Sequence, residues 1–474
     1  MVFDQRKSPD VQASFAILHR ASRSDLLVSA SQRKDRLRRL LALLKQHATE
    51  FAAAISADFG HRSAQETELA ESLIIEFGIK HALNQLDHWM RPKRVATQLP
   101  FLPGSNRLIP QPLGVVGIIS PWNYPLQLTL APMVGALAAG NRVMIKPSEL
   151  VPRFSALLGT AVGEHFDAAE AAVVEGDADI AKTFASLPFD HLLFTGSARV
   201  GRLVAAAAAR NLTPVTLELG GKSPAVIDRS VELAAAAHRI AFGKLLNAGQ
   251  TCIAPDYVLC PRELEQQFVE LFFASAESLY GSDFANPDYT TIIDQPHYDR
   301  LESLLDDAKR KGAQIATRAE HLADWRAVRK FPPCVVRSST AEMLLSQEEI
   351  FGPVLPIVAY DAVEEAIAYV NSHERPLALY WFGRHAGARD KVLRETISGA
   401  VTINDCLLHI AQENQPFGGV GASGMGAYHG ESGFRTFSKE KPVFYRRRFS
   451  ATDLMQPPYG PRFQHLVAAL RWLI

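Results

Sequence analysis

Between residues 113 and 218, short apolar runs alternate with segments long enough to form helices. A helix-length connection returns the chain to the starting end of a sheet, so successive strands pair in parallel. The sequence therefore predicts an α/β fold with a parallel sheet, and such sheets bind nucleotides at the carboxyl ends of their strands. The candidate strands are residues 114–119, 142–145, 171–174, 191–194 and 215–217.

Helical and glycine-rich segments surround this region. Residues 31–89 are predicted to be helical, because leucines and arginines alternate there at helical spacing. Prolines between residues 92 and 110 favour an extended or looped passage after it. A second α/β stretch runs from residue 223 to 403, and the many glycines of residues 418–433 predict an irregular loop.

The composition excludes several classes of protein. Of the 474 residues, 47% are apolar and 21% are charged, whereas a disordered chain has fewer apolar residues and a larger net charge. Lysine plus arginine and aspartate plus glutamate each number 50, so the net charge favours no nucleic-acid partner. We find no signal peptide and no apolar stretch of about 18 residues, which predicts a cytoplasmic protein.

Four cysteines occur, at positions 252, 260, 334 and 406, and none forms a C-x-x-C pair. No H-E-x-x-H or other metal-ligand motif is present either. We therefore expect neither a disulfide framework nor a metal site. Cys252 differs from the others because small and polar residues precede it in the segment 247–252, as in a tight, accessible loop. A thiolate in such a loop attacks carbonyl carbons, and the alternative is a small buried apolar side chain, which suits Cys260 and Cys334.

Two further residues carry groups that suit carbonyl chemistry. Glu218 ends an apolar strand and precedes two glycines. Burial raises the pKa of such a carboxyl group and makes it a general base, although a strand-end ion pair is the alternative. Asn123 lies between two prolines, and its amide offers donors for an oxyanion. The alternative for Asn123 is an ordinary turn residue.

Two segments after predicted strands suit a nucleotide. Lys146 and Glu149 follow the second strand, where a lysine bonds ribose or phosphate and a carboxylate accepts from ribose hydroxyls. Gly196 and Gly201 flank Ser197 between a strand and a helix, and glycines there let the backbone approach a pyrophosphate. For the first segment the alternative is an exposed helix start. The second departs from G-x-G-x-x-G and is a weak fingerprint alone.

Seven motifs together resemble the aldehyde dehydrogenase superfamily, over about residues 31–437. Their order and spacing are similar to those of that family. The motifs are PWNYP from residue 121, IKPSE from 145, FTGSARVG from 194, LELGGKSP from 217, NAGQTC from 247, EEIFGPV from 348 and PFGGVGASGMG from 416.

The resemblance implies a role for each matching residue. Cys252 would be the nucleophile, Glu218 the general base, and Asn123 with the Cys252 N–H the oxyanion hole. The implied cofactor is NAD, with NADP as the alternative. The implied cofactor contacts are Trp122, Lys146, Glu149, Gly196, Ser197, Gly201, Leu219, Glu349 and Phe351, and the implied substrate contacts are Tyr124, Ile253 and Phe417.

The resemblance also implies an architecture. A Rossmann-like, parallel-sheet NAD(P)-binding domain would be built from residues 1–87 and 107–218, and an α/β catalytic domain from residues 219–400. A small β bridging element, residues 88–106 and 401–440, would join two subunits as a homodimer. Residues 441–474 would form a C-terminal tail.

Details of the motifs are similar to the class 3-like branch of the family, namely Tyr124 and the segments 88–92 and 252–257. Within that branch, residues 90–95 and 243–247 resemble bacterial coniferyl aldehyde dehydrogenases. The implied reaction is oxidation of coniferyl aldehyde, or of another aromatic or aliphatic aldehyde, to the acid through a Cys252 thiohemiacetal and thioester. The alternatives are a fatty aldehyde dehydrogenase with peripheral membrane association, a non-redox Cys/Glu esterase and a catalytically silent relative.

The tail has a separate pattern. Residues 445–449 are basic and aromatic, and a following apolar stripe has helical spacing. The stripe is too short to cross a bilayer. We expect it to pack against its own domain or a partner subunit, with an interfacial membrane contact as the alternative. The stripe residues are Phe463, Leu466, Val467, Leu470, Leu473 and Ile474.

Overall fold

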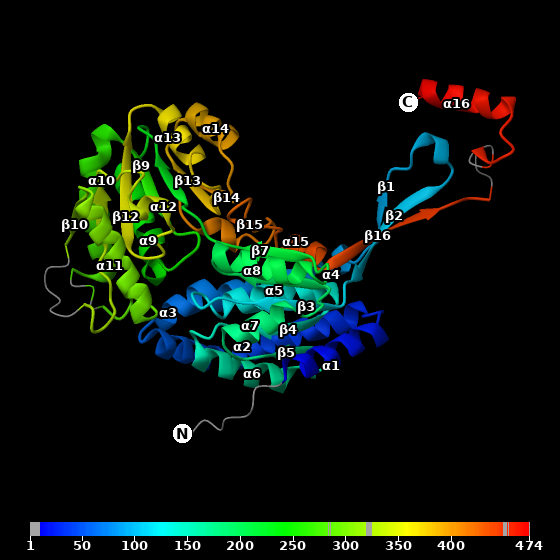
Figure 1. Cartoon of the computed structure of the whole chain (residues 1–474), viewed down its shortest axis with the longest axis horizontal. Helices are drawn as coiled ribbons and strands as arrows, with labels where there is room; N and C mark the ends of the chain where they lie inside the picture. Colours follow the sequence, from blue (N-terminus) through cyan, green and yellow to red (C-terminus); the bar gives the residue numbers. More distant parts are fainter. Residues whose placement is uncertain are drawn as a thin grey trace.

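Three β-sheets organise the computed structural model, which describes residues 10–282, 284, 286–318, 325–448, 453 and 455–473 (Figure 1). A six-stranded and a seven-stranded sheet form the cores of two lobes, and a three-stranded sheet extends from the first lobe as an arm. The predicted α/β class is confirmed.

The six-stranded sheet has the order β15-β7-β6-β3-β4-β5. The five strands β3 to β7 pair in parallel, and only the two-residue β15 runs antiparallel, beside β7. These five strands lie where the apolar runs predicted them. The bounds are β3 Val115–Ile119, β4 Arg142–Lys146, β5 Ala171–Val173, β6 His191–Thr195, β7 Val215–Glu218 and β15 Gly424–Met425.

Helices cover both faces of this sheet. Alternate side chains of a strand point to opposite faces, so Val116 and Ile118 join one core and Val115 and Ile119 join another. The first core includes α2 (Ala30–Phe59), α4 (Leu73–Trp89), α5 (Gln127–Ala139), α6 (Pro152–His165) and α15 (Gly430–Thr436). The second includes α1 (Val11–Ser24), α7 (Ala178–Ala185) and α8 (Ala198–Ala209).

The seven-stranded sheet has the order β10-β11-β12-β9-β8-β13-β14, parallel except for β10. Helices α9 and α10 pack on one face, while α13 and α14 cover the other. The strands are β8 Pro224–Ile227, β9 Tyr257–Pro261, β10 Gln314–Thr317, β11 Cys334–Arg337, β12 Val354–Tyr360, β13 Ala378–Phe382 and β14 Ala400–Ile403. The helices are α9 Leu233–Leu245, α10 Glu265–Tyr280, α11 Gln295–Arg310, α12 Leu344–Gln347, α13 Val363–Asn371 and α14 Ala386–Glu395.

The arm consists of β1 (Lys93–Val95), β2 (Ser105–Pro112) and β16 (Ser438–Tyr445), in the order β1-β2-β16. We expected the bridging element to take residues 88–106 and 401–440. In the structure β2 continues to residue 112 and β16 to residue 445, while β14, which begins at residue 400, pairs with β13 in the seven-stranded sheet. The pairing of β2 with β16 thus extends the arm beyond the residues that we expected for the bridging element.

Two predicted segments differ in detail from the sequence reading. The helical stretch 31–89 is interrupted after Gly60, which has a φ of 87° and ends α2. The chain re-enters helix at α3 (Ala64–Thr67), and the break places the side chain of Arg62 inside the protein. The glycine-rich segment 418–433 is mostly irregular, but it also contains β15 and the start of α15.

Beyond the arm, α16 (Pro461–Leu473) lies apart from both lobes (Figure 1). Its stripe residues Phe463, Leu466, Val467 and Leu470 are half-buried, whereas Trp472 is 86% exposed. Among the described residues, no helix combines the length and the apolar character that crossing a bilayer requires. Phe449 and Ile474, which belonged to the predicted tail patterns, lie outside the described residues.

Candidate active site

The predicted motifs follow the carboxyl ends of the strands of the six-stranded sheet. Ile119 pairs with Lys146 on one side and with Phe194 on the other, and Thr195 pairs with Glu218. Because these strands are parallel and in register, their carboxyl ends lie in one row. The segments that follow them, 120–125, 147–150, 196–201 and 219–222, therefore start from neighbouring points.

Cys252 follows a short turn with unusual backbone conformation. Asn247, Ala248 and Gly249 have φ values of 54°, 51° and 76°, all in the left-handed region. Such residues cost free energy and persist only where the surroundings fix them. A side chain on Gly249 would also collide with the carbonyl of Gly352. The surrounding structure of the seven-stranded lobe thus fixes the conformation of this turn.

The amide of Gln250 fixes this turn. Its Nε2 donates to the carbonyls of Asn247 and Thr291, both at 3.0 Å, and its Oε1 accepts from the Ile293 N–H at 2.9 Å. The side chain is 1% exposed, so these bonds satisfy both ends of a buried amide. Gln250 thus holds the turn before Cys252 in place, a role that the sequence alone did not reveal.

Asn123 and Tyr124 join the turn from the other lobe. Asn123 Nδ2 donates to the Gln250 carbonyl at 3.1 Å, and the carbonyl of Asn123 accepts from Asn247 Nδ2 at 2.9 Å. The Tyr124 hydroxyl lies 2.7 Å from Thr251 Oγ1. An amide nitrogen carries two hydrogens, so one hydrogen of Asn123 remains for another acceptor beside Cys252.

A buried ion cluster holds this contact in place. Arg62 donates to Glu66 at 3.2 Å, to Glu71 at 2.8 Å and to the Asn123 carbonyl at 3.2 Å. Glu71 also accepts from the N–H groups of residues 126 and 127 at the start of α5, at 2.7 and 2.9 Å. The Arg62 guanidinium lies 4.9 Å from the centre of the Tyr124 ring.

Glu218 lies at the end of β7 with both carboxylate oxygens buried and without a hydrogen-bond partner among the described residues. The side chain is 2% exposed, and burial raises the pKa of its carboxyl group well above the ordinary value. The ion-pair alternative is therefore wrong for this residue. A buried carboxyl group without partners costs free energy, and its raised pKa gives the ionised form a strong affinity for a proton.

Cys252 lies near two acidic side chains. Its residue is partly exposed, yet burial of the sulfur, and then the charges of Glu349 and Glu218, raise the pKa of the thiol. Cys260 and Cys334 are buried inside the seven-stranded lobe, as the sequence predicted. The structure thus brings one thiol and two carboxyl groups together between the lobes.

Glu349 faces the first glycine after Leu219. A Cβ on Gly220 would overlap the Glu349 carboxylate, so only glycine permits this approach. Burial and Asp256 raise the pKa of Glu349 to about 8. A cleft of about 210 Å³ opens here between the two lobes, lined among others by Ala198, Arg202, Gly220, Glu349 and Arg375.

The remaining predicted cofactor residues lie at the same carboxyl ends of the strands. Lys146 Nζ lies 3.2 Å from the half-exposed Glu149 carboxylate. Ser197 is the N-cap of α8, and the Gly196 N–H donates to the Glu218 carbonyl at 3.0 Å. A Cβ on Gly201 would come within 2.7 Å of Leu219 Cδ2, so glycine allows α8 to pack against the end of β7.

The remaining predicted site residues contact aromatic side chains. The rings of Trp122 and Phe351 lie 5.5 Å apart, edge to face. Phe417 stacks on His409 and His429 at 6.0 and 5.3 Å. Ile253 is buried, and its carbonyl accepts from the Tyr380 hydroxyl.

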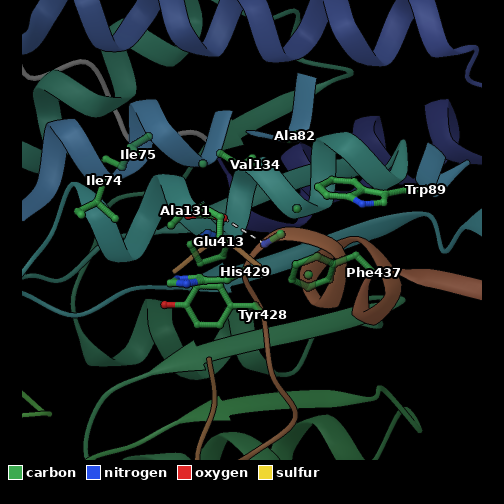
Figure 2. A pocket seen from close by; sticks show the side chains of 15 residues that line it. Ile74, Ile75, Ala82, Trp89, Ala131, Val134, Glu413, Tyr428, His429 and Phe437 are labelled. Atoms are coloured by element: carbon green, nitrogen blue, oxygen red, sulfur yellow. Dashed lines mark hydrogen bonds between the residues drawn. The ribbon is translucent and has the colours of Figure 1, made fainter. Parts of the chain in front are cut away.

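Sequence reasoning missed three polar side chains, Glu413, Tyr428 and His429, which line one pocket together (Figure 2). The Tyr428 hydroxyl is buried with no hydrogen-bond partner among the described residues, and the charges of Glu218, Cys252 and Glu413 help raise the pKa of its phenol. Glu413 accepts from the Gly430 N–H at 3.2 Å, and burial raises the pKa of Glu413 to about 7. Tyr428 was not singled out because residues 418–433 were interpreted as an irregular loop, and no motif in that segment includes a tyrosine.

Comparisons with known proteins agree with this geometry. The sequence model of the aldehyde dehydrogenase family matches residues 3–443. A probable coniferyl aldehyde dehydrogenase of Pseudomonas aeruginosa is 48% identical over 98% of this chain and 97% of that protein. The substrate-bound structure of Staphylococcus aureus AldH superposes with a TM-score of 0.92 at 37% identity, covering 97% of this chain and 99% of that one. A betaine aldehyde dehydrogenase of the same organism, in complex with NAD⁺, superposes with a TM-score of 0.83 at 25% identity, covering 94% of this chain and 88% of that one.

The buried ion cluster can be tested through stability. Glu71→Gln replaces two acceptor oxygens by one, so the side chain can no longer accept both from Arg62 and from the N–H groups of residues 126 and 127. A buried donor left without an acceptor costs about 1–3 kcal/mol. We expect a lower urea concentration at the unfolding midpoint. Glu68→Gln, on the exposed face of the same helical turn, is the matched control and should change stability by less than about 0.5 kcal/mol. Equal midpoints for the two variants would contradict the importance of the cluster.

Proposed function

The chain belongs to the aldehyde dehydrogenase family and oxidises an aldehyde to the carboxylic acid with NAD(P), and we propose how its own residues divide that work. The observation that carries the proposal is the convergence of Cys252, Glu218 and Asn123 between the two lobes. Cys252 is the nucleophile, Glu218 the general base, and Asn123 a donor to the oxyanion.

In the first step the Cys252 sulfur bonds to the aldehyde carbon and gives a thiohemiacetal. The carbonyl oxygen becomes negative, and the free hydrogen of the Asn123 amide, together with the Cys252 N–H, donates to it. One such donor contributes about 3 kcal/mol to the stability of the transition state. The hydrogen bond from Asn123 to Gln250 supports this role, because it fixes the amide beside the nucleophile before substrate arrives.

The resting site favours a protonated thiol, since burial and the neighbouring carboxyl groups raise the pKa of Cys252. Bound NAD(P) in its oxidised form supplies a hydride acceptor and a positive charge, and a positive charge near the sulfur lowers the pKa of a thiol. The residues that would hold the cofactor lie at the carboxyl ends of the parallel strands and in the cleft. Lys146 and Glu149 suit the adenine ribose, Ser197 at the α8 N-terminus suits the pyrophosphate, and Glu349 suits the nicotinamide ribose.

The second half of the reaction is hydrolysis of the thioester on Cys252. Glu218 accepts a proton from the attacking water, the oxygen bonds to the acyl carbon, and the sulfur leaves as thiolate. The raised pKa of Glu218 supports this role because the ionised carboxylate then binds a proton more strongly than an ordinary glutamate does. The absence of any ion-pair partner among the described residues keeps its oxygens available for water.

We propose an aromatic, conjugated aldehyde as substrate, such as coniferyl aldehyde. Tyr380 and Tyr428 lie close enough to Cys252 to interact electrostatically with it, and Phe417 packs against Tyr428 at 5.9 Å. Flat apolar substrates gain free energy from contact with such rings. The 48% identical relative that carries the name of a probable coniferyl aldehyde dehydrogenase supports the same class.

Two subunits are proposed to pair through the arm. The outer edges of β1 and β16 have no neighbouring strand among the described residues, and an exposed strand edge is a template for pairing with another chain. Phe444 and Tyr445, near the end of β16, are 46% and 43% exposed. Apolar side chains beside an open edge favour a homodimer.

Pre-steady-state formation of NADH tests the two catalytic roles. Glu218→Gln should give a burst of about one NADH per chain followed by a steady rate at least about 100-fold lower than the parent, because the acyl-enzyme accumulates. Cys252→Ala is the matched control: it should give no burst while still binding NAD. A Glu218→Gln variant with a normal steady rate would refute the general base. Ester hydrolysis by the parent with no NADH formed from any aldehyde would instead favour the esterase.

A substrate panel tests the aromatic preference. With cinnamyl-type, benzyl and medium-chain aliphatic aldehydes, we expect kcat/KM to be highest for the cinnamyl type by about fivefold, since a ring contact contributes about 1 kcal/mol. Phe417→Leu keeps an apolar side chain but removes the ring, and should reduce this preference. A higher kcat/KM for aliphatic aldehydes would favour the fatty-aldehyde alternative.

Sedimentation equilibrium tests the arm. The parent should have twice the mass of one chain, and Phe444→Glu combined with Tyr445→Glu should shift the mass towards that of a monomer by placing charge at the interface. Leu212→Glu, at a residue that is 89% exposed beyond α8, is the control and should stay dimeric. An unchanged dimer in the double variant would show that the subunits pair elsewhere.

A further inference from the structure

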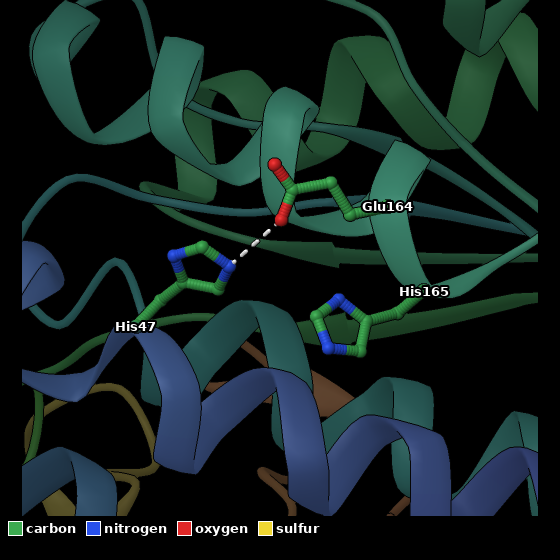
Figure 3. A group of neighbouring side chains, drawn as sticks. All are labelled: His47, Glu164 and His165. Carbon is green, nitrogen blue, oxygen red and sulfur yellow. Dashed lines mark hydrogen bonds and ion pairs between the residues drawn. The ribbon is translucent and has the colours of Figure 1, made fainter.

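Two histidines and a glutamate meet on the outer side of the six-stranded lobe (Figure 3). His47 lies on α2, and Glu164 and His165 are the last two residues of α6. One nitrogen of each ring and one carboxylate oxygen all lie within 4.8 Å of one another. Sequence analysis predicted no metal site, and it could not find this cluster because 117 residues separate His47 from Glu164.

The hydrogen bonds of His165 define its free nitrogen. Its Nδ1 lies 2.9 Å from the carbonyl of Ala161, one helical turn earlier. A carbonyl only accepts, so Nδ1 carries the hydrogen, and Nε2 of the neutral ring has a free lone pair. A histidine that ligates a metal is typically oriented in this way, by donating its other nitrogen to a carbonyl or a carboxylate.

His47 repeats the arrangement with a carboxylate. Its Nδ1 lies 2.6 Å from Glu50 Oε2, and an ionised carboxylate only accepts. Its Nε2 lies 3.2 Å from Glu164 Oε2. With the hydrogen on Nδ1, both atoms of that contact carry a lone pair, and a metal ion between them would accept both.

We propose that His47, Glu164 and His165 bind a divalent transition metal ion of the zinc class. Two imidazole nitrogens and one carboxylate are the ligands that zinc prefers, whereas calcium and magnesium prefer oxygen alone. Tetrahedral bonds of about 2.0–2.1 Å set ligand atoms about 3.4 Å apart, so the three ligand atoms must approach one another. Figure 3 shows the Nδ1 side of the His165 ring towards Glu164, so the His165 side chain must also turn to present Nε2 to the ion. Glu50 orients His47 and does not ligate.

The surroundings allow an ion to enter. His47 is 8% exposed, which removes water from one side of the site, while the side chains of Glu164 and Glu50 are 48% and 61% exposed. Water can therefore fill the fourth position of a tetrahedral ion.

The site would fasten two packed helices. Asp58 on α2 already accepts from the N–H groups of Arg153 and Phe154, at 3.2 and 2.9 Å, at the first turn of α6. An ion at His47 would attach α2 to the opposite end of α6, so that both ends of this helix are held. The expected role is stabilisation of the lobe, separate from the chemistry at Cys252.

Equilibrium dialysis of the full chain with ZnCl₂ tests the site. The parent for this experiment carries Cys252→Ala, because a reactive thiol also binds zinc. We expect one zinc ion per chain with a micromolar or lower Kd, and about tenfold or greater weakening in His165→Gln and in Glu164→Gln. Glu50→Gln should weaken binding less, because it removes only an orienting contact. His238→Gln, at an exposed histidine of α9, is the control and should bind as the parent does.

Thermal unfolding gives a second measurement. Zinc at about 100 times its Kd should raise the unfolding temperature of the parent by a few degrees, and should not raise that of Glu164→Gln. Glu164 is half-exposed, so this variant is expected to fold normally, and its zinc-free unfolding temperature checks that. Absence of zinc binding at a zinc concentration about 100 times the expected micromolar Kd would overturn the proposal. Unchanged stoichiometry and Kd in both ligand variants would also overturn it and leave His47, Glu164 and His165 as a cluster that binds no metal.

Discussion

The active-site geometry depends on a positive charge buried where the two lobes meet. Arg62 has no exposed surface on its side chain, and a buried charge is tolerated only when its partners are close and well oriented. Those partners are Glu66, Glu71 and the carbonyl of Asn123. Since Glu71 also binds the start of α5, the segment that carries Asn123 is held from both sides. The side-chain amide of Asn123 then donates to the turn before Cys252. The position of an oxyanion donor therefore depends on the hydrogen bonds of the Arg62 guanidinium.

Burial has a second consequence at the reacting groups. Glu218, Glu349 and Cys252 lie in surroundings that disfavour negative charge, and the pKa of each is raised. Without a cofactor, such a site holds protons and keeps its sulfur unreactive. A positive charge brought into the cleft reverses that preference. The same burial that strengthens the affinity of Glu218 for a proton thus also restrains Cys252 from unwanted reaction.

Much of the fold could be predicted because the signals are local. Apolar runs and helix-length connections define β3 to β7 within a few residues, and the motif residues follow those strands directly. The break after Gly60 was missed because a lone glycine inside a helical pattern is also tolerated without ending the helix. The resemblance assigned residues 401–440 to the bridging element, whereas the α/β pattern had placed the chain up to residue 403 in the second lobe, where β14 pairs with β13. Tyr428 and Glu413 were missed because their importance arises from neighbours distant in sequence.

The sequence by itself determined which residues have the chemistry: a cysteine in a tight turn, a carboxylate at a strand end, an amide between two prolines and glycines where the backbone must approach a ligand. These follow from residue type and from spacing along the chain. Only the tertiary structure decided how they act together. It brought the ion cluster of Arg62 under Asn123, left Glu218 without a partner among the described residues, and set His47 beside Glu164 and His165. Burial, and therefore pKa and charge pairing, depends on distances across the fold, which spacing along a chain does not encode.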